Sequence, residues 1–284
     1  MKKLVLVIAL SLTQFAYGTK PQATIVYGDD NREDIYHVRN ELFLKLAKSS
    51  AAFISNHSLK DYSQEEVELS GETLLNKKKC ETERFVNQPA VASCSGFLIG
   101  KNKIATAGHC VQDKNSCLIK SWVFDYKMDF EGQEKILVEK KNIYKCINII
   151  AFKNNPLSKE DYAIVELDRD VIDREPLELR SSGKLEVGDE LVVIGHPSGL
   201  PTKIADGANV RAINDIYFTA NLDTFSINSG SGVFNAKTGL VEGILVRGDM
   251  DYIWTENKCE VVNQVGNDEG RGEEVTLITR LPKI

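Results

Sequence analysis

From about residue 91 onward, the chain consists of short apolar segments separated by turn-forming residues. The segments are 95–100, 103–108, 121–126, 135–140, 146–152, 161–167, 190–196, 209–214, 216–222, 231–235 and 239–248. Many short strands at close spacing, with turn signals between them, are typical of an all-β sandwich or barrel. The sequence therefore predicts an all-β domain over residues 91–284, in which the polar stretch 168–188 is a candidate linker between two halves.

The first 18 residues differ in character from the rest. Lys2 and Lys3 precede a short apolar run, and small residues stand at Ala16 and Gly18. This arrangement is typical of a secretory signal peptide, here expected to be cleaved after Gly18. The run is short for a membrane-spanning helix, and no later segment stays apolar for long enough to span a bilayer. We therefore expect a secreted or periplasmic protein without a stable membrane anchor.

Residues 19–90 are interpreted as an N-terminal extension of the all-β domain. Within it, 23–28 has the character of a short strand, and apolar residues recur at helical spacing along 33–49. The spaced residues are Ile35, Val38, Leu42 and Leu46. The polar run Asp29, Asp30, Asn31 can cap the start of this helix.

Charge and cysteine content narrow the class of function. The chain carries a formal charge of −6, and removal of residues 1–18 would take away two lysines and no acids, leaving −8. Such an acidic protein is a poor candidate for binding nucleic acid. An even number of cysteines, six in this chain, suggests disulfides in an exported protein. Zinc is the alternative, but no Cys-x-x-Cys pair occurs, and we expect no metal site.

The segment 94–110 reads as a stapled hairpin. Two apolar strands flank the turn 100–103, and a hairpin centred at Asn102 places Cys94 opposite Cys110. A disulfide there would hold the loop that carries His109. A lone histidine is usually structural or on the surface. Here the small residues before it, the stapled hairpin end and a candidate nucleophile downstream together favour a catalytic role.

Two further residues complete a candidate catalytic set. Asp161 opens a strongly apolar strand, either as a simple strand-entry aspartate or as the acid that orients a histidine and stabilises its imidazolium. Ser229 lies in a glycine-containing turn, where backbone N–H groups can point at one oxygen. The order His109, Asp161, Ser229 is the order of chymotrypsin rather than that of subtilisin or the α/β-hydrolases.

The chain resembles secreted bacterial trypsin-like peptidases of the chymotrypsin fold, near the glutamyl endopeptidase branch. The segments that carry the resemblance are 106–110, 161–165, 194–201, 228–235 and 243–248. The resemblance implies two six-stranded Greek-key β-barrels with the active site in the cleft between them. It also implies that His109, Asp161 and Ser229 act as base, orienting acid and nucleophile, and it selects Ser229 over the neighbouring Ser231. The implied reaction is hydrolysis of protein or peptide substrates through an acyl-enzyme, without a cofactor, and we expect a monomer.

One departure from the family motif bears on activity. The resemblance implies that the N–H groups of Ile227 and Ser229 form the oxyanion hole, but the family has glycine where this chain has Ile227. A β-branched residue disfavours positive φ, so we expect this N–H to point away from the site. Losing one such donor costs about 10²–10³ in rate. A slow protease is therefore expected, and a weak or inactive binding protein that kept the fold is the alternative.

A second departure concerns activation. Asn228 replaces the acid that receives the new N-terminal ammonium in digestive zymogens. Because asparagine cannot form that ion pair, activation of this type is not expected.

The resemblance also suggests a specificity pocket. Asp223 lies six residues before Ser229, the offset of an aspartate that forms the base of the pocket and selects Arg or Lys; the alternative is a simple turn residue. Thr224 matches a threonine with which glutamyl endopeptidases bind a carboxylate, but Leu245 stands where those enzymes need a histidine. Gly248 is expected in the same pocket. We favour cleavage after basic residues, with Glu-specific cleavage as the alternative.

For the disulfides, the hairpin predicts Cys94–Cys110, and the other four cysteines allow three pairings. We favour Cys117–Cys146, which is local to the first barrel, and Cys80–Cys259, which would tie the extension to the last strands. Each bridge would stabilise the fold by about 2–4 kcal/mol.

Overall fold

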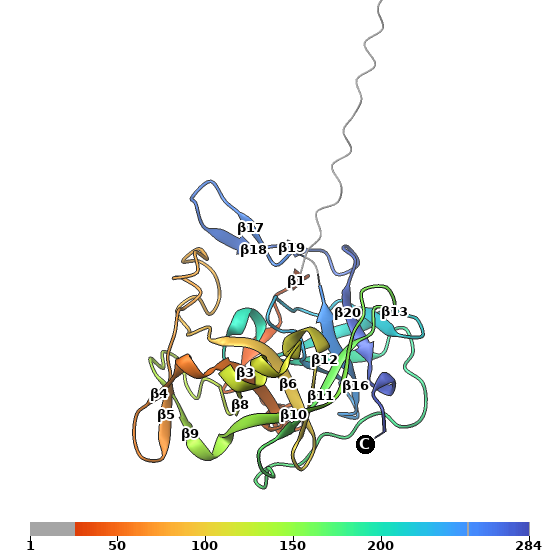
Figure 1. Ribbon diagram of the computed structural model, residues 1–284. Coiled ribbons are helices and arrows are strands. Elements are labelled where there is room, and N and C mark those ends of the chain that lie inside the picture. Colours follow the sequence, from red (N-terminus) through yellow and green to blue (C-terminus); the bar gives the residue numbers. More distant parts are fainter. Residues whose placement is uncertain (1–25, 249, 284) are drawn as a thin grey trace, which may run out of the picture.

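The computed structural model describes residues 26–248 and 250–283, so the expected signal peptide at 1–18 lies outside the described residues. Within these ranges, none of the helices combines the length and the apolar character that crossing a membrane requires. The described chain forms two β-barrels with several small sheets at their periphery (Figure 1).

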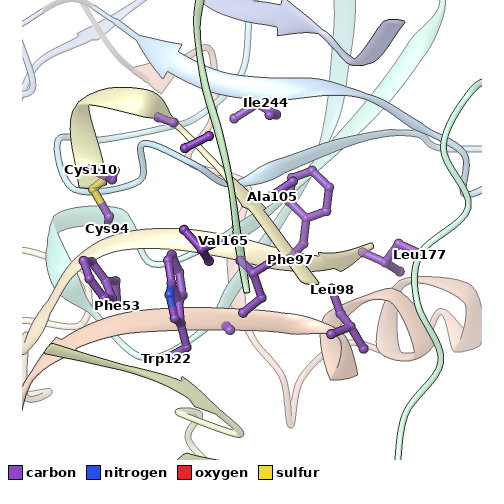
Figure 2. Close-up of a cluster of buried hydrophobic side chains, with 14 of the residues drawn as sticks. Phe53, Cys94, Phe97, Leu98, Ala105, Cys110, Trp122, Val165, Leu177 and Ile244 are labelled. Atoms are coloured by element: carbon purple, nitrogen blue, oxygen red, sulfur yellow. A yellow bond between two sulfur atoms is a disulfide. The ribbon is translucent and has the colours of Figure 1, made fainter. Parts of the chain in front are cut away.

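The first barrel is a closed ring of six antiparallel strands in the order β10-β11-β7-β6-β3-β8. Its strands are β3 (Ser50–Ser55), β6 (Ala92–Gly100), β7 (Lys103–Thr106), β8 (Lys120–Phe124), β10 (Ile143–Asn154) and β11 (Asp161–Leu167). Large side chains fill its interior, where Phe53 stacks on Trp122 with 4.5 Å between ring centroids (Figure 2). Phe97 and Val165 from other strands are also fully buried in this core.

The second barrel has six antiparallel strands in the order β12-β15-β16-β20-β14-β13, closed by the pairing of β12 with β13. Its strands are β12 (Glu190–Gly195), β13 (Lys203–Ile213), β14 (Tyr217–Ala220), β15 (Gly232–Asn235), β16 (Val241–Arg247) and β20 (Glu273–Leu277). A short strand, β2 (Arg32–Asp34), adds to the outside of β13. The two six-stranded barrels confirm the predicted fold class. No helix or strand lies between β11 and β12, at residues 168–189.

The remaining elements surround the barrels. The strands are β1 (Val26–Tyr27), β4 (Leu59–Asp61), β5 (Glu66–Leu69), β9 (Ile136–Glu139), β17 (Tyr252–Trp254), β18 (Glu260–Val262) and β19 (Gln264–Val265). The α-helices are α1 (Glu41–Lys48) and α2 (Lys114–Ile119). The 3₁₀ helices are Asn56–Ser58, Gly108–Val111, Lys140–Asn142, Pro197–Gly199 and Ile278–Arg280. β9 pairs with β5, so the segment 135–140 belongs to a small outer sheet and not to a barrel.

The N-terminal segment is more tightly integrated than the sequence suggests. β3 closes the first barrel between β6 and β8, so the predicted boundary between residues 90 and 91 cuts through that barrel. The predicted helix start is also wrong. Asn40 caps α1 by accepting the Leu42 N–H at 3.0 Å, because residues 32–34 are taken up as β2 on the second barrel.

The disulfides join Cys80 to Cys259, Cys94 to Cys110 and Cys117 to Cys146, the pairings favoured from the sequence. The hairpin argument for the second of these needs correction. Phe97 pairs with Ala105, so the register would bring Cys94 opposite residue 108 rather than opposite Cys110. A register shift near the turn accounts for one residue of this offset, and Cys110 reaches its partner from the 3₁₀ helix after β7.

Candidate active site

The first barrel presents His109 and Asp161 together. His109 lies in the 3₁₀ helix that follows β7, and Asp161 is the first residue of β11, which pairs with β7. The turn passes so close to β10 that a Cβ on Gly108 would lie 1.9 Å from the carbonyl oxygen of Lys153. Only glycine fits this approach, so Gly108 brings the histidine backbone against the sheet.

Two contacts orient the histidine. Nδ1 of His109 lies 2.8 Å from Oδ2 of Asp161, and its backbone N–H donates to Oδ1 at 3.1 Å. The aspartate is only 3% exposed, whereas the histidine side chain is 32% exposed. A carboxylate at Nδ1 favours the tautomer that keeps the proton there and leaves Nε2 as an acceptor. The pair can therefore accept a proton from a neighbouring hydroxyl.

Ser229 comes from the second barrel, in the turn before β15. Its carbonyl oxygen accepts the backbone N–H of Ser95 at 2.8 Å, which joins the turn to the first barrel. Gly230 next to it has φ 90°, and a Cβ there would lie 2.0 Å from the Ser95 carbonyl oxygen. Ser229 and His109 line the same cavity of about 620 Å³. No hydrogen bond joins their side chains among the described residues, and such contacts often tighten only when substrate binds.

The hydroxyl of Ser231, the alternative nucleophile, is hydrogen-bonded within the turn. Ser231 is fully buried, and its Oγ lies 2.6 Å from the carbonyl oxygen and 2.7 Å from Oδ1 of Asn228. Asn228 is itself 2% exposed, so its side chain is satisfied inside the turn. This geometry favours Ser229 as the reactive hydroxyl.

The oxyanion loop departs from expectation at Ile227. Its φ is 75°, in the left-handed region that a β-branched residue was expected to avoid. The Ser226 carbonyl oxygen accepts the N–H of Ser198 at 2.8 Å. Because the C=O and N–H of a trans peptide point in opposite directions, the Ile227 N–H faces away from Ser198. The N–H groups of Ile227 and Ser229 have no acceptor among the described residues, unlike the next amide, that of Asn228, which donates to Phe225.

A hairpin outside the barrels supports this loop. β17 and β18 pair with each other as a hairpin (Figure 1). The Cys80–Cys259 disulfide ties their connection to the N-terminal segment. Asp251 Oδ2 accepts the Ser226 N–H at 2.7 Å, and the hydroxyls of Tyr252 and Ser198 lie 2.7 Å apart. Burial raises the pKa of Asp251 to about 6. Ser226, the residue before Ile227, is therefore held at its N–H by Asp251 and at its C=O by Ser198.

The structure does not bring Asp223 into the cavity. Its carboxylate accepts the N–H groups of Tyr27 at 2.9 Å and Asn31 at 2.8 Å, and the residue is 4% exposed. Burial raises its pKa to about 6, although these two hydrogen bonds work in the opposite direction. The predicted role of Asp223 as the base of the specificity pocket is therefore wrong, because its carboxylate is hydrogen-bonded to the N-terminal segment.

The other two predicted pocket residues, Thr224 and Gly248, do line the cavity. Sequence reasoning missed Glu273, which lines it as well and accepts the Thr224 hydroxyl at 2.6 Å. The sequence feature that could have indicated a strand here is the apolar run after the glutamate pair 273–274, which forms β20. Leu245 also lines the cavity, at the position where a Glu-specific enzyme needs a histidine.

Arg247 lies beside Asp161. Its Nη1 is 3.5 Å from Asp161 Oδ2, and its Nε donates to Glu274 at 2.7 Å. The Glu274 carboxyl also contacts Lys159, and these two cations hold its pKa below the usual range against the opposing effect of burial. These contacts therefore hold the Arg247 side chain in the wall of the site.

One cluster in the described part of the chain gathers potential metal ligands. Cys94, His109 and Cys110 have ligand atoms within 4.8 Å of one another. The two sulfurs are joined to each other in a disulfide (Figure 2), so they cannot act as the thiolates that zinc binds.

Comparison with solved structures finds the same fold at low sequence identity. The Vibrio cholerae VesB protease matches with a TM-score of 0.52 and 15% identity over 90% of this chain, but the match spans only 64% of the VesB chain. A Glu endopeptidase matches with a TM-score of 0.50 and 16% identity, covering 90% of this chain and 94% of that one. A comparison with curated protein sequences found no match. The family model of the trypsin-like peptidase domain matches residues 94–244, more than half of the sequence, and the chain therefore belongs to that family.

Proposed function

We propose that the protein is a serine endopeptidase in which Ser229, His109 and Asp161 form the catalytic triad. The observation that carries the proposal is that Ser229 from the second barrel and His109 from the first line one cavity, while Asp161 of the first barrel contacts Nδ1 of His109. Membership of the peptidase family and the fold of the structural neighbours support the same class of reaction.

The geometry suggests a conventional order of steps. Nε2 of His109 accepts the Ser229 proton as Oγ attacks the carbonyl carbon of the peptide bond. The N–H groups of Ile227 and Ser229 stabilise the oxyanion, and Asp161 stabilises the imidazolium. His109 then donates its proton to the departing amine and leaves an acyl-enzyme. In the second half, His109 takes a proton from water, and the resulting attack releases the acid and restores the serine.

The alternatives receive less support. A non-catalytic binding protein was suggested by Ile227, but the N–H of Ile227 donates to no acceptor among the described residues. A Glu-specific enzyme would have to place a substrate carboxylate in a cavity that contains Glu273 and has Leu245 in place of the expected histidine. Like charges at short range in a buried site repel strongly.

The compartment is also part of the proposal. Three disulfides are typical of an oxidising environment, which agrees with an exported, secreted or periplasmic protein.

A serine-directed fluorophosphonate probe tests the proposed function. The wild type should label stoichiometrically, and Ser229→Ala should not label. Ser231→Ala is the matched control, because it removes a hydroxyl two residues away that is bonded within the turn. It should retain labelling if circular dichroism shows a folded protein. A folded wild type that does not label would favour the binding-protein alternative.

A further inference from the structure

Lys120 is a partly buried cation in the wall of the catalytic cavity. It is the first residue of β8 and lies on the same face of that strand as Trp122, which is fully buried in the barrel core. Its Nζ is 5.1 Å from the ring centroid of Phe53, which stacks on Trp122. Phe53 pairs with Cys94 across β3 and β6, beside the Cys94–Cys110 disulfide (Figure 2). The aromatic stack therefore holds the lysine next to this disulfide.

The contacts of Lys120 within the protein do not balance its charge. Nζ donates to Oγ of Ser93 at 3.0 Å, and this hydroxyl in turn donates to the carbonyl oxygen of Phe53 at 2.8 Å. An ammonium group has three N–H donors, and the other two have no acceptor among the described residues. Burial lowers the pKa of Lys120, and no neighbouring acid in the described chain opposes this effect. A partly buried cation of this kind is stabilised when a carboxylate binds to it.

The other cations in the cavity wall differ from Lys120 in this respect. His109 contacts Asp161, and Arg247 donates to Glu274. Among the cations that line the cavity in the described chain, Lys120 alone has no acidic partner. The first-barrel wall of the cavity therefore offers a positive charge to a bound molecule.

The position of Lys120 points to the part of the cleft that receives the leaving group. Thr224 and Gly248, the expected pocket for the residue before the cleaved bond, line the cavity from the second barrel. On the first-barrel side, Sγ of Cys110 lies 3.6 Å from the carbonyl oxygen of Ser229. A peptide with one side chain at Thr224 and Gly248 and its reacting carbonyl at Ser229 would continue past the disulfide toward Lys120.

We propose that Lys120 binds the carboxylate of an Asp or Glu side chain in the part of the substrate that follows the cleaved bond. This inference rests on the proposed function, because it assigns the first-barrel wall of the catalytic cavity to the leaving group. Ser93 orients the ammonium group, and the ring of Phe53 supports the aliphatic part of the lysine.

The kinetic test starts from a quenched peptide that the wild type cleaves at one site, located by mass spectrometry. The peptide is remade with Glu, Gln or Lys at the first and at the second position after that site. At one of these positions the wild type should favour Glu over Gln by about 10-fold in kcat/KM, as expected for a hydrogen-bonded charge pair. Lys120→Met keeps the length of the side chain without its charge, and it should reduce this ratio to below about twofold. Lys120→Glu should reverse the preference, so that Lys is favoured over Glu.

Lys145→Met is the matched control. Lys145 lies on β10 and pairs with Ser121 of β8, but it is exposed and does not line the cavity. Its loss changes the net charge by the same amount, and the preference for Glu should remain. A labelled wild type that cleaves the Glu and Gln peptides equally at both positions would overturn the inference and leave the proposed function intact. So would a preference for Glu that persists in Lys120→Met, or one that is confined to positions before the cleaved bond.

A binding measurement separates this inference from the proposed function. The ligands are two alanine hexapeptides that carry a single central Glu or a single central Gln. In NMR titrations, Ser229→Ala should bind the Glu peptide at least about fivefold more tightly, and the double variant with Lys120→Met should bind both peptides equally. This result would support the Lys120 site even if the wild type failed to label. Equal binding of the two peptides by Ser229→Ala would contradict it. Should Lys120→Met not fold, Lys120→Arg keeps the charge and should retain the preference for Glu, whereas Lys120→Glu should lose it.

Discussion

Replacing Ile227 by glycine tests whether the oxyanion loop is already in its working conformation. The structure holds Ile227 at φ 75° through the Ser198 contact to Ser226 O and the Asp251 contact to Ser226 N. The Ile227 N–H therefore already has its working orientation, and a more flexible residue would not improve it. We expect Ile227→Gly to change kcat by less than about threefold, rather than the roughly hundredfold gain of a recovered donor.

The effect on stability follows from opposing terms. Glycine relieves the left-handed strain of about 1–2 kcal/mol. It gives up the packing of a half-buried side chain against the cluster that contains Tyr126, worth about 1 kcal/mol, and adds about 0.5–1 kcal/mol of loop entropy. The free energy of unfolding should therefore stay within about 1 kcal/mol of the wild type.

The assay combines steady-state kinetics on a reporter peptide, the fluorophosphonate labelling rate and urea unfolding. Ile227→Ala is the matched control, because it keeps a Cβ at positive φ but loses the packing, and it should be the less stable of the two variants. A rise of about 30-fold or more in kcat for Ile227→Gly, with a parallel rise in labelling, would show that isoleucine misdirects the N–H.

Two further predictions concern groups around the site. Tyr252→Phe removes the hydroxyl contact to Ser198, so kcat should fall about three- to tenfold with little change in KM, because the oxyanion forms only near the transition state; an effect on KM alone would contradict this role. Burial lowers the pKa of His196 to about 3, so the unfolded chain binds a proton below about pH 6.5 that the folded protein does not. Stability should therefore fall with decreasing pH, by about 2 kcal/mol between pH 6.5 and 5 from this residue. His196→Phe, which can keep the stacking on Tyr126, should show a smaller fall in urea titrations at the two pH values, and an identical fall would refute the assignment.

The sequence predicted the elements that follow local rules. Alternating apolar segments with turns between them gave most barrel strands, and the motifs around His109, Asp161 and Ser229 gave the candidate triad. β3 was missed because it follows directly on a helical pattern. β20 was missed because it opens with two glutamates, which are buried only through distant partners such as Thr224 and Arg247.

The errors at the site have long-range causes. Asp223 was predicted to face the pocket, but its two N–H donors lie more than 190 residues away in the chain. Ile227 was expected to avoid positive φ, a sound local rule that tertiary hydrogen bonds from the 198 turn and Asp251 override. No local sequence pattern near Asp223 or Ile227 predicts these long-range contacts.

The central claim is that Ser229 forms an acyl-enzyme, and p-nitrophenyl acetate tests it directly. The account predicts a burst of nitrophenolate close to one equivalent per protein, with the acetyl group located on Ser229 by peptide mass mapping. Ser229→Ala should show no burst, and His109→Ala should slow it strongly. A folded wild type that releases nitrophenolate without a burst, or that carries the acetyl group on another residue, would contradict the account.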